Sequence, residues 1–145
     1  MARNAMDTSA VLKLYRAEPN SPLVRACVAP ADDLLIFELA PIEIVSASYG
    51  LVRQNILTKI EADTLIATFE SDRTNYRIIP FEDAILQEAE RLLRKYAAVI
   101  SLRPMDAFHL AAALVEHRRN PLDAFVTTDK ILISAAQSEG LVVKP

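Results

Sequence analysis

The chain has 145 residues, of which 52% are hydrophobic, and its formal net charge at pH 7 is −3 with an isoelectric point of about 5.4. This length and composition predict one domain with a substantial core and exclude an intrinsically disordered chain. The mild acidity argues against broad electrostatic binding of nucleic acid, which normally requires a basic domain or face.

Scarce residue types exclude several kinds of site. The two glycines, Gly50 and Gly140, cannot build a glycine-rich phosphate loop or a dinucleotide-binding fingerprint. The single cysteine, Cys27, rules out an internal disulfide and a cysteine-based zinc site, and two histidines cannot complete a zinc site alone. Neither a signal peptide nor an apolar run of membrane-spanning length is evident, so we expect a cytoplasmic protein.

The first half of the chain alternates strand-like and helix-like segments. A strand running up to Met6 is followed by a turn into a helix over residues 7–18, which Pro19 ends. The later segments are, in order, a short helix at 21–29, an apolar strand at 33–39, a helix opened by Pro41 at 41–54, and a helix at 58–75 that begins with a capping box of Thr58 and Glu61.

The second half continues this alternation. Its segments are, in order, a strand at 76–80, an amphipathic helix at 81–99, a helix from Pro104 to about Arg118, a strand at 123–128, a helix at 130–139 with Gly140 just past its end, and a strand at 141–143. Strands that alternate with helices predict a parallel sheet of four to five strands with helices on both faces. Without internal repeats or linkers, we expect residues 1–145 to form a single α/β domain.

Four carboxylates lie in or beside the first turns of predicted helices. They are Asp7, Glu43, Asp106 and Asp129. Taken singly, helix capping or a favourable interaction with the helix dipole accounts for each of them. In open parallel sheets, however, ligands bind beyond the carboxyl ends of the strands, so we expect the four acids to converge on one rim. Converging carboxylates repel each other unless cations intervene, and oxygen donors suit Mg²⁺ or Mn²⁺, so the pattern indicates a metal site.

Four blocks of sequence around these acids resemble the motif blocks of PIN domains, in the same order and at similar spacing. The blocks are MDTSAVLKLY, APIEIVSA, RPMDAFHLAAAL and FVTTDKIL…EGLVV, and they span essentially the whole chain. The chain is most similar to the VapC-like toxin ribonucleases of type II toxin–antitoxin pairs. The resemblance implies a three-layer α/β fold in which the four acids hold Mg²⁺ or Mn²⁺ and form the catalytic centre.

Neighbouring residues and partners also acquire expected roles. Ser9 and Thr127 match hydroxyl residues of the family that orient carboxylates or metal-bound water. The resemblance implies an RNA substrate and a VapB-like antitoxin, and we also expect a homodimer. Lys13 and Arg16, on the helix after Asp7, are candidates for contacts to an RNA backbone, although a solvated helix face explains them equally well.

The first strand departs from the family pattern. This strand is normally a run of Val, Ile and Leu, whereas here Arg3 and Asn4 occupy it, so we expect a short or frayed strand that loosens the position of Asp7. A second ambiguity concerns Glu38, which ends the apolar strand near the same rim. It is a rival of Glu43, which matches the family block better.

Other residues also have structural interpretations. His109 lies three residues after Asp106 on a largely apolar predicted helix. The preferred interpretation is a core or hydrogen-bonded histidine rather than a catalytic one. The surface near Leu65, Ile66 and Phe69 fits core packing about as well as a homodimer or antitoxin interface. Ion pairing along helices is the preferred interpretation of the basic residues Arg91, Arg94, Lys95 and Arg103, and core packing that of Phe37, Phe69 and Phe108.

The leading hypothesis is a metal-dependent endoribonuclease, a hydrolase in which two ions activate a water and stabilise the leaving oxygen. A catalytically degraded PIN-like RNA- or protein-binding module is the alternative, supported by the unusual first strand and the acidic isoelectric point. A phosphotransfer domain of receiver or haloacid-dehalogenase type ranks last. Pro80 ends the strand where a receiver carries its aspartate, and Ser9 stands where a dehalogenase requires a second one.

Overall fold

The computed structural model of the protein describes residues 1–28 and 32–145. Within these residues the chain forms a sheet with the order β3-β2-β1-β4-β5, in which every pair of neighbouring strands is parallel. The strands are β1 (Arg3–Met6), β2 (Asp33–Phe37), β3 (Tyr76–Ile79), β4 (Ala124–Val126) and β5 (Val143–Lys144). The predicted α/β class with a parallel sheet is confirmed.

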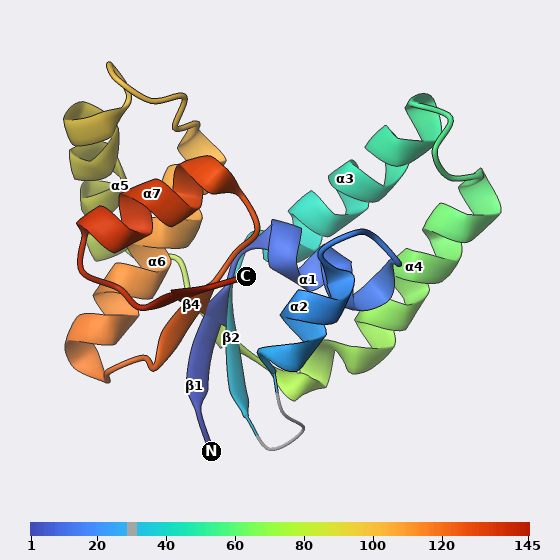
Figure 1. Ribbon diagram of the computed structural model, residues 1–145, viewed down its shortest axis with the longest axis horizontal. Helices are drawn as coiled ribbons and strands as arrows, with labels where there is room; N and C mark the ends of the chain where they lie inside the picture. Colours follow the sequence, from blue (N-terminus) through green and yellow to red (C-terminus); the bar gives the residue numbers. More distant parts are fainter. Residues whose placement is uncertain (29–31) are drawn as a thin grey trace.

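Helices cover both faces of this sheet, which makes a three-layer structure (Figure 1). The first four helices lie on one face and the last three on the other. The helices are α1 (Thr8–Tyr15), α2 (Ser21–Ala26), α3 (Ala40–Arg53), α4 (Lys59–Asp72), α5 (Asp83–Tyr96), α6 (Pro104–Arg119) and α7 (Lys130–Ser138), with a short 3₁₀ turn, η1 (Arg73–Asn75), after α4.

The two core clusters follow from the alternation of side chains along the strands. Ala5 of β1 with Leu35 and Phe37 of β2 pack against α5, α6 and α7. Met6 and Ile36, one position along in each strand, pack against the helices of the other face. Because successive strand residues point to opposite faces, a sheet covered on both sides needs apolar residues at consecutive positions. This requirement explains the near-continuous apolar run of β2.

The first strand is short, as expected, but it is not frayed. It occupies the centre of the sheet and pairs with β2 on one side and β4 on the other. Arg3 is held at the start of the strand, because its guanidinium donates to Glu116 Oε1 at 2.7 Å, to the carbonyl of Asn120 at 2.7 Å and to Asp33 Oδ2 at 3.3 Å. These contacts anchor the strand that leads to Asp7.

Most predicted elements are present with altered ends. The capping box of Thr58 and Glu61 is confirmed at the start of α4. The helix predicted at 81–99 is shorter, since α5 spans Asp83–Tyr96. The helix predicted at 21–29 is observed as Ser21–Ala26, and residue 29 lies outside the described residues. Among the helices that the structure describes, none has the length and apolar character needed to cross a membrane.

Candidate active site

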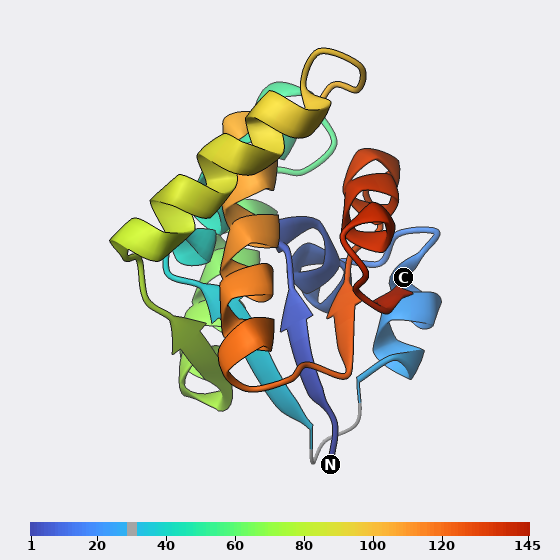
Figure 2. The ribbon, with the colours of Figure 1, turned by 90° about the vertical axis from the view of Figure 1, so that its left-hand side faces the viewer.

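The four acids of the sequence pattern all lie at the carboxyl-terminal edge of the sheet. Asp7 directly follows β1, and Asp129 lies three residues beyond the end of β4, which pairs with β1. Glu43 lies in the first turn of α3, which follows β2. Asp106 lies in the first turn of α6. This helix runs antiparallel to the strands and so leads back to the start of β4 (Figure 2). Parallel pairing therefore gathers segments that are far apart in the sequence.

Asp7 is buried and fully engaged by hydrogen bonds. Its side chain is the N-cap of α1, because Oδ1 accepts the backbone N–H of Ala10 at 3.0 Å. The hydroxyl of Ser9 donates to both carboxylate oxygens, at 2.9 and 2.8 Å, and Thr127 Oγ1 donates to Oδ2 at 2.9 Å. Burial raises the pKa of Asp7 above its ordinary value, while the Ala10 amide, His109 and the two hydroxyls oppose this rise.

Thr127 connects two of the acids. Besides donating to Asp7, its hydroxyl oxygen accepts the backbone N–H of Asp129 at 3.1 Å. The Asp129 side chain in turn caps α7, because Oδ1 accepts the backbone N–H groups of Ile131 and Leu132 at 2.8 and 3.1 Å. Thr127 thus lies where a residue that orients carboxylates is needed, and the capping interpretation of Asp129 also holds.

Glu43 is held by two side chains that the sequence did not assign to the site. Its Oε1 accepts a 2.7 Å hydrogen bond from the hydroxyl of Thr8, and His109 Nε2 contacts the same oxygen. Burial alone would raise the pKa of Glu43, but the interactions with His109 and Thr8 outweigh it and the pKa is lowered. Thr8 adjoins Asp7, and His109 lies one helical turn after Asp106. Both spacings are signals that point to the site.

Asp106 shares a surface hollow with Glu43. The hollow has a volume of about 370 Å³ and is lined by Glu43, Arg103, Pro104, Met105 and Asp106. Asp106 Oδ2 accepts the backbone N–H of Arg103 at 3.3 Å and lies 3.5 Å from its Nε. The Arg103 side chain is 76% exposed, so its guanidinium remains accessible from solvent.

The donor set suits a hard cation, although the acids are not assembled around one position. Among residues 1–28 and 32–145, no group of three His, Cys, Asp or Glu side chains is arranged closely enough to hold an ion. Within the described residues, one carboxylate oxygen in each of three of these acids has no hydrogen-bond partner: Glu43 Oε2, Asp106 Oδ1 and Asp129 Oδ2. Oxygen donors of this kind fit Mg²⁺ or Mn²⁺, so binding requires these side chains to draw together.

The other candidate residues have local partners. Glu38, the rival of Glu43, is exposed, and its Oε2 accepts the backbone N–H of Phe81 at 3.4 Å. Lys13 and Arg16 both form ion pairs with Glu18. Phe37 and Phe69 are fully buried and Phe108 is partly buried against the core, which confirms their predicted packing.

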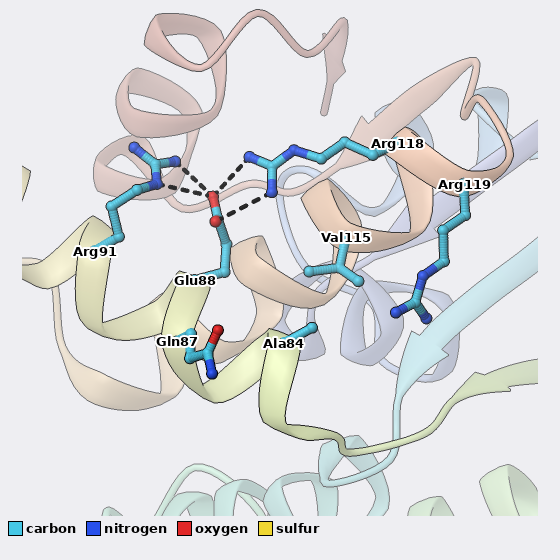
Figure 3. A pocket seen from close by; sticks show the side chains of 7 residues that line it. All are labelled: Ala84, Gln87, Glu88, Arg91, Val115, Arg118 and Arg119. Atoms are coloured by element: carbon cyan, nitrogen blue, oxygen red, sulfur yellow. Dashed lines mark hydrogen bonds and ion pairs between the residues drawn. The ribbon is translucent and has the colours of Figure 1, made fainter.

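A second hollow, of about 430 Å³, lies between α5 and α6 away from the acids (Figure 3). Glu88 is clamped there between Arg91 and Arg118, which donate to it from opposite sides. Arg118 lies about three turns, or roughly 18 Å, beyond Asp106 along α6. Because these charges are paired, we interpret the residues around this hollow as an ion-pair network that joins the two helices. It confirms the ion-pairing interpretation of Arg91.

Comparison with known proteins supports the same family. The sequence model described as PIN domain matches residues 5–138. Similar solved structures include FitAcB from Neisseria gonorrhoeae, at 19% identity and a TM-score of 0.67, covering 98% of this chain and 96% of that chain. VapC20 of Mycobacterium tuberculosis, a sarcin–ricin loop cleaving toxin, has 17% identity and a TM-score of 0.67, with coverage of 98% and 99%.

VapBC2 of Rickettsia felis bound to a promoter DNA fragment is also similar, with 14% identity, a TM-score of 0.65 and coverage of 98% of this chain and 97% of that chain. At such identities the likeness shows a shared fold. Among curated protein sequences, no significant match was found. The match over residues 5–138 covers most of the sequence, and the parallel sheet has the expected helices on both faces. The chain belongs to the PIN domain family.

Proposed function

We propose that the protein is a Mg²⁺- or Mn²⁺-dependent endoribonuclease and the toxin of a type II toxin–antitoxin pair. The observation that carries this proposal is the set of hydrogen bonds at one rim that connects three of the four acids, Asp7, Glu43 and Asp129, through Thr8 and Thr127. Thr127 joins Asp7 to Asp129, and Thr8, next to Asp7, joins it to Glu43. Membership of the PIN domain family supports the reaction class, since the family model covers this rim.

In this proposal Asp7, Glu43, Asp106 and Asp129 hold the metal ions. Bound Mg²⁺ or Mn²⁺ would supply Lewis acidity for a phosphodiester and a water of lowered pKa. The contribution of the chain is orientation: the hydroxyls of Ser9 and Thr127 fix the buried Asp7 carboxylate from two sides. No side chain has to act as a nucleophile, which agrees with the absence of an activated serine or cysteine in the sequence pattern.

RNA contacts require positive charge beside an acidic rim. Lys13 on α1 and Arg16 just after it are proposed for this role, and each would exchange its ion pair with Glu18 for a phosphate. Arg103 is a third candidate because it lines the same hollow as Glu43 and Asp106 and its side chain is largely exposed. Cations confined to this rim reconcile RNA binding with a net charge of −3.

An antitoxin and a second copy of the chain are the proposed protein partners. Several similar structures are complexes of this type, such as the toxin–antitoxin complex from Klebsiella pneumoniae, with a TM-score of 0.58. Leu65 and Phe69 are buried, so the surface suggested by the sequence is mainly core. Among the exposed apolar side chains, Ile42 on α3 is 67% exposed and Ile60 on α4 is 78% exposed.

Cleavage of single-stranded RNA by the purified protein, with Mn²⁺ and with a chelator, tests the proposal. We expect Mn²⁺-dependent internal cleavage that Asp106→Asn abolishes while its circular dichroism spectrum stays unchanged. Glu38→Gln is the matched control, because Glu38 is a carboxylate of the same rim outside the proposed set. Unchanged cleavage by both Asp7→Asn and Asp106→Asn would overturn the site. RNA binding without Mn²⁺ binding or cleavage would support the degraded module.

A further inference from the structure

His109 is a buried histidine whose polar contacts are directed at the candidate site. The residue is 4% exposed and lies on α6. Its Nε2 contacts Glu43 Oε1 and lies 3.2 Å from Thr8 Oγ1. Its Nδ1 is buried and has no hydrogen-bond partner among the described residues. The ring therefore has no polar interaction on the side away from Thr8 and Glu43.

The direction of these hydrogen bonds follows from the chemistry of the partners. A carboxylate oxygen can only accept, so His109 Nε2 carries a hydrogen that points to Glu43. The hydroxyl of Thr8 donates to the same oxygen at 2.7 Å. The imidazole also packs against the ring of Phe37, which meets it edge-on at a centroid distance of 6.0 Å and an angle of 85°.

The two donors distinguish the two oxygens of Glu43. An ionised carboxylate has about two lone-pair sites on each oxygen, and Thr8 and His109 occupy those of Oε1. Oε2 has no partner among the described residues, and Glu43 lines the hollow that also contains Asp106. Glu43 is thus held by one oxygen and offers the other to a ligand.

The donors also come from the segments that carry the neighbouring acids. Thr8 follows Asp7 at the start of α1, and His109 lies on α6 one turn after Asp106. One oxygen of Glu43 is therefore the point at which α1, α3 and α6 are joined by polar contacts. These two contacts hold Oε1 in place, so that Asp106 and Asp129 would have to approach Glu43 when an ion binds.

We propose that His109, together with Thr8, is a positioning residue that fixes Glu43 as a single-oxygen donor to the metal centre. The inference rests on the proposed function, because it concerns how a ligand of that centre is held. His109 itself is not a ligand and does not touch the substrate. Its role is to supply an N–H at the position of Nε2.

Three substitutions of His109 separate this donor from simple packing. Gln places its side-chain amide near the position of Nε2, whereas Asn is shorter and Leu fills the space without a donor. Mn²⁺ binding to the full chain, measured by isothermal titration calorimetry, is the primary readout, and RNA cleavage is the second. We expect His109→Leu and His109→Asn to weaken Mn²⁺ binding roughly tenfold or more, and His109→Gln to stay within about threefold of the unmodified protein.

Two further variants protect the test against misfolding. Thr8→Val removes the other donor to Glu43 Oε1 without altering α6, and we expect it to weaken Mn²⁺ binding in the same direction. His117→Leu is the matched control, because His117 lies on the same helix but its Nδ1 accepts the backbone N–H of Leu122. Mn²⁺ binding by His117→Leu should equal that of the unmodified protein.

The possible results separate this inference from the proposed function. If the unmodified protein binds Mn²⁺ and His109→Leu and Thr8→Val bind it equally well, the inference is overturned and the proposed function stands. If His109→Gln binds as weakly as His109→Leu, with circular dichroism showing that both are folded, the N–H donor is not what positions Glu43. An unmodified protein that binds no Mn²⁺ overturns both.

Discussion

Thr127 Oγ1 donates a 2.9 Å hydrogen bond to Asp7 Oδ2, and so connects the ends of two neighbouring parallel strands. The two residues are 120 positions apart in the sequence. Thr127 is fully buried and also accepts the backbone N–H of Asp129. One hydroxyl thereby sets the distance between the first and the last acid of the rim.

Replacing Thr127 by Val should disturb the site more than the fold. The change keeps the shape of the side chain but leaves Asp7 without one donor, so we expect a loss of about 1–2 kcal/mol in the free energy of unfolding. Mn²⁺ affinity should fall roughly tenfold, as for other residues that orient ligands. Chemical denaturation and calorimetry measure the two effects. Thr128→Val, whose hydroxyl contacts Ser9 at 3.4 Å, should change both much less.

Asp7→Asn should abolish RNA cleavage without unfolding the protein. Burial raises the pKa of Asp7, so the folded state disfavours its charged form, and this cost is present at pH values above the ordinary pKa of 3.8. A neutral amide removes that cost. At pH 7 without added metal we therefore expect a melting temperature equal to or higher than that of the unmodified protein. A strongly destabilised variant would contradict this account of Asp7.

Lowering the pH should reduce the free energy of unfolding because it protonates Glu139. Its side chain is 8% exposed, and burial alone would raise its pKa, but hydrogen bonds from Arg91, Lys95 and Tyr96 lower the pKa to about 2. A lowered pKa stabilises the fold above the ordinary value of 4.5, and this stability is lost as the pH falls from about 4.5 towards 2. The loss should be on the order of 2 kcal/mol.

Glu139→Gln tests this pH dependence. Its unfolding free energy, measured by urea denaturation at several pH values, should be lower than that of the unmodified protein at pH 7 and should fall less between pH 4.5 and 2. Glu90→Gln is the control, because Glu90 forms an exposed pair with Arg94 on the surface of α5. Exposed pairs of this kind contribute little, so the control should follow the unmodified protein. Parallel curves for Glu139→Gln and the unmodified protein would argue against the assignment.

Arg103→Ala should weaken RNA binding without altering the chemical step. We expect KM to rise several-fold with a nearly constant kcat, and the slope of log affinity against log salt to fall by about 0.7, the value for one phosphate contact on a single strand. Arg94→Ala is the matched control, because Arg94 is 78% exposed but lies on α5 in a pair with Glu90. Equal KM values for the two variants would exclude Arg103 from the RNA path.

The position of Asp7 and Asp129 at one rim could be predicted from the sequence, because parallel strands end at the same edge and both residues follow strand-like runs. The contacts of Thr8 and His109 with Glu43 could not be predicted from the sequence. Thr8 and His109 reach Glu43 across 35 and 66 positions, and only the tertiary fold, which brings the first turns of α1, α3 and α6 to one rim, places these side chains together. A local pattern predicts which face of a helix is apolar, but it does not predict which residue meets it.

The first strand illustrates the same limit. A charged residue such as Arg3 in a central strand predicts weak strand pairing. Its charge is in fact paired with Glu116, which lies 113 positions away on α6, and a local pattern does not predict this contact. The helix predicted at 81–99 is also longer at both ends than α5, which spans Asp83–Tyr96. Hydrophobic periodicity predicts that a helix is present, but it does not predict the residue at which the helix begins or ends.

The central place of β1 has a consequence for the protein while it is being synthesised. β1 leaves the ribosome well before its neighbour β4, and the hydroxyl of Thr127 lies 120 positions after Asp7. Until then Asp7 lies at the end of a strand with one open edge, and Asp129 has not yet emerged. A nascent or truncated chain that lacks β4 therefore has no complete set of acids, and any activity of this rim begins only after β4 and Asp129 have been synthesised.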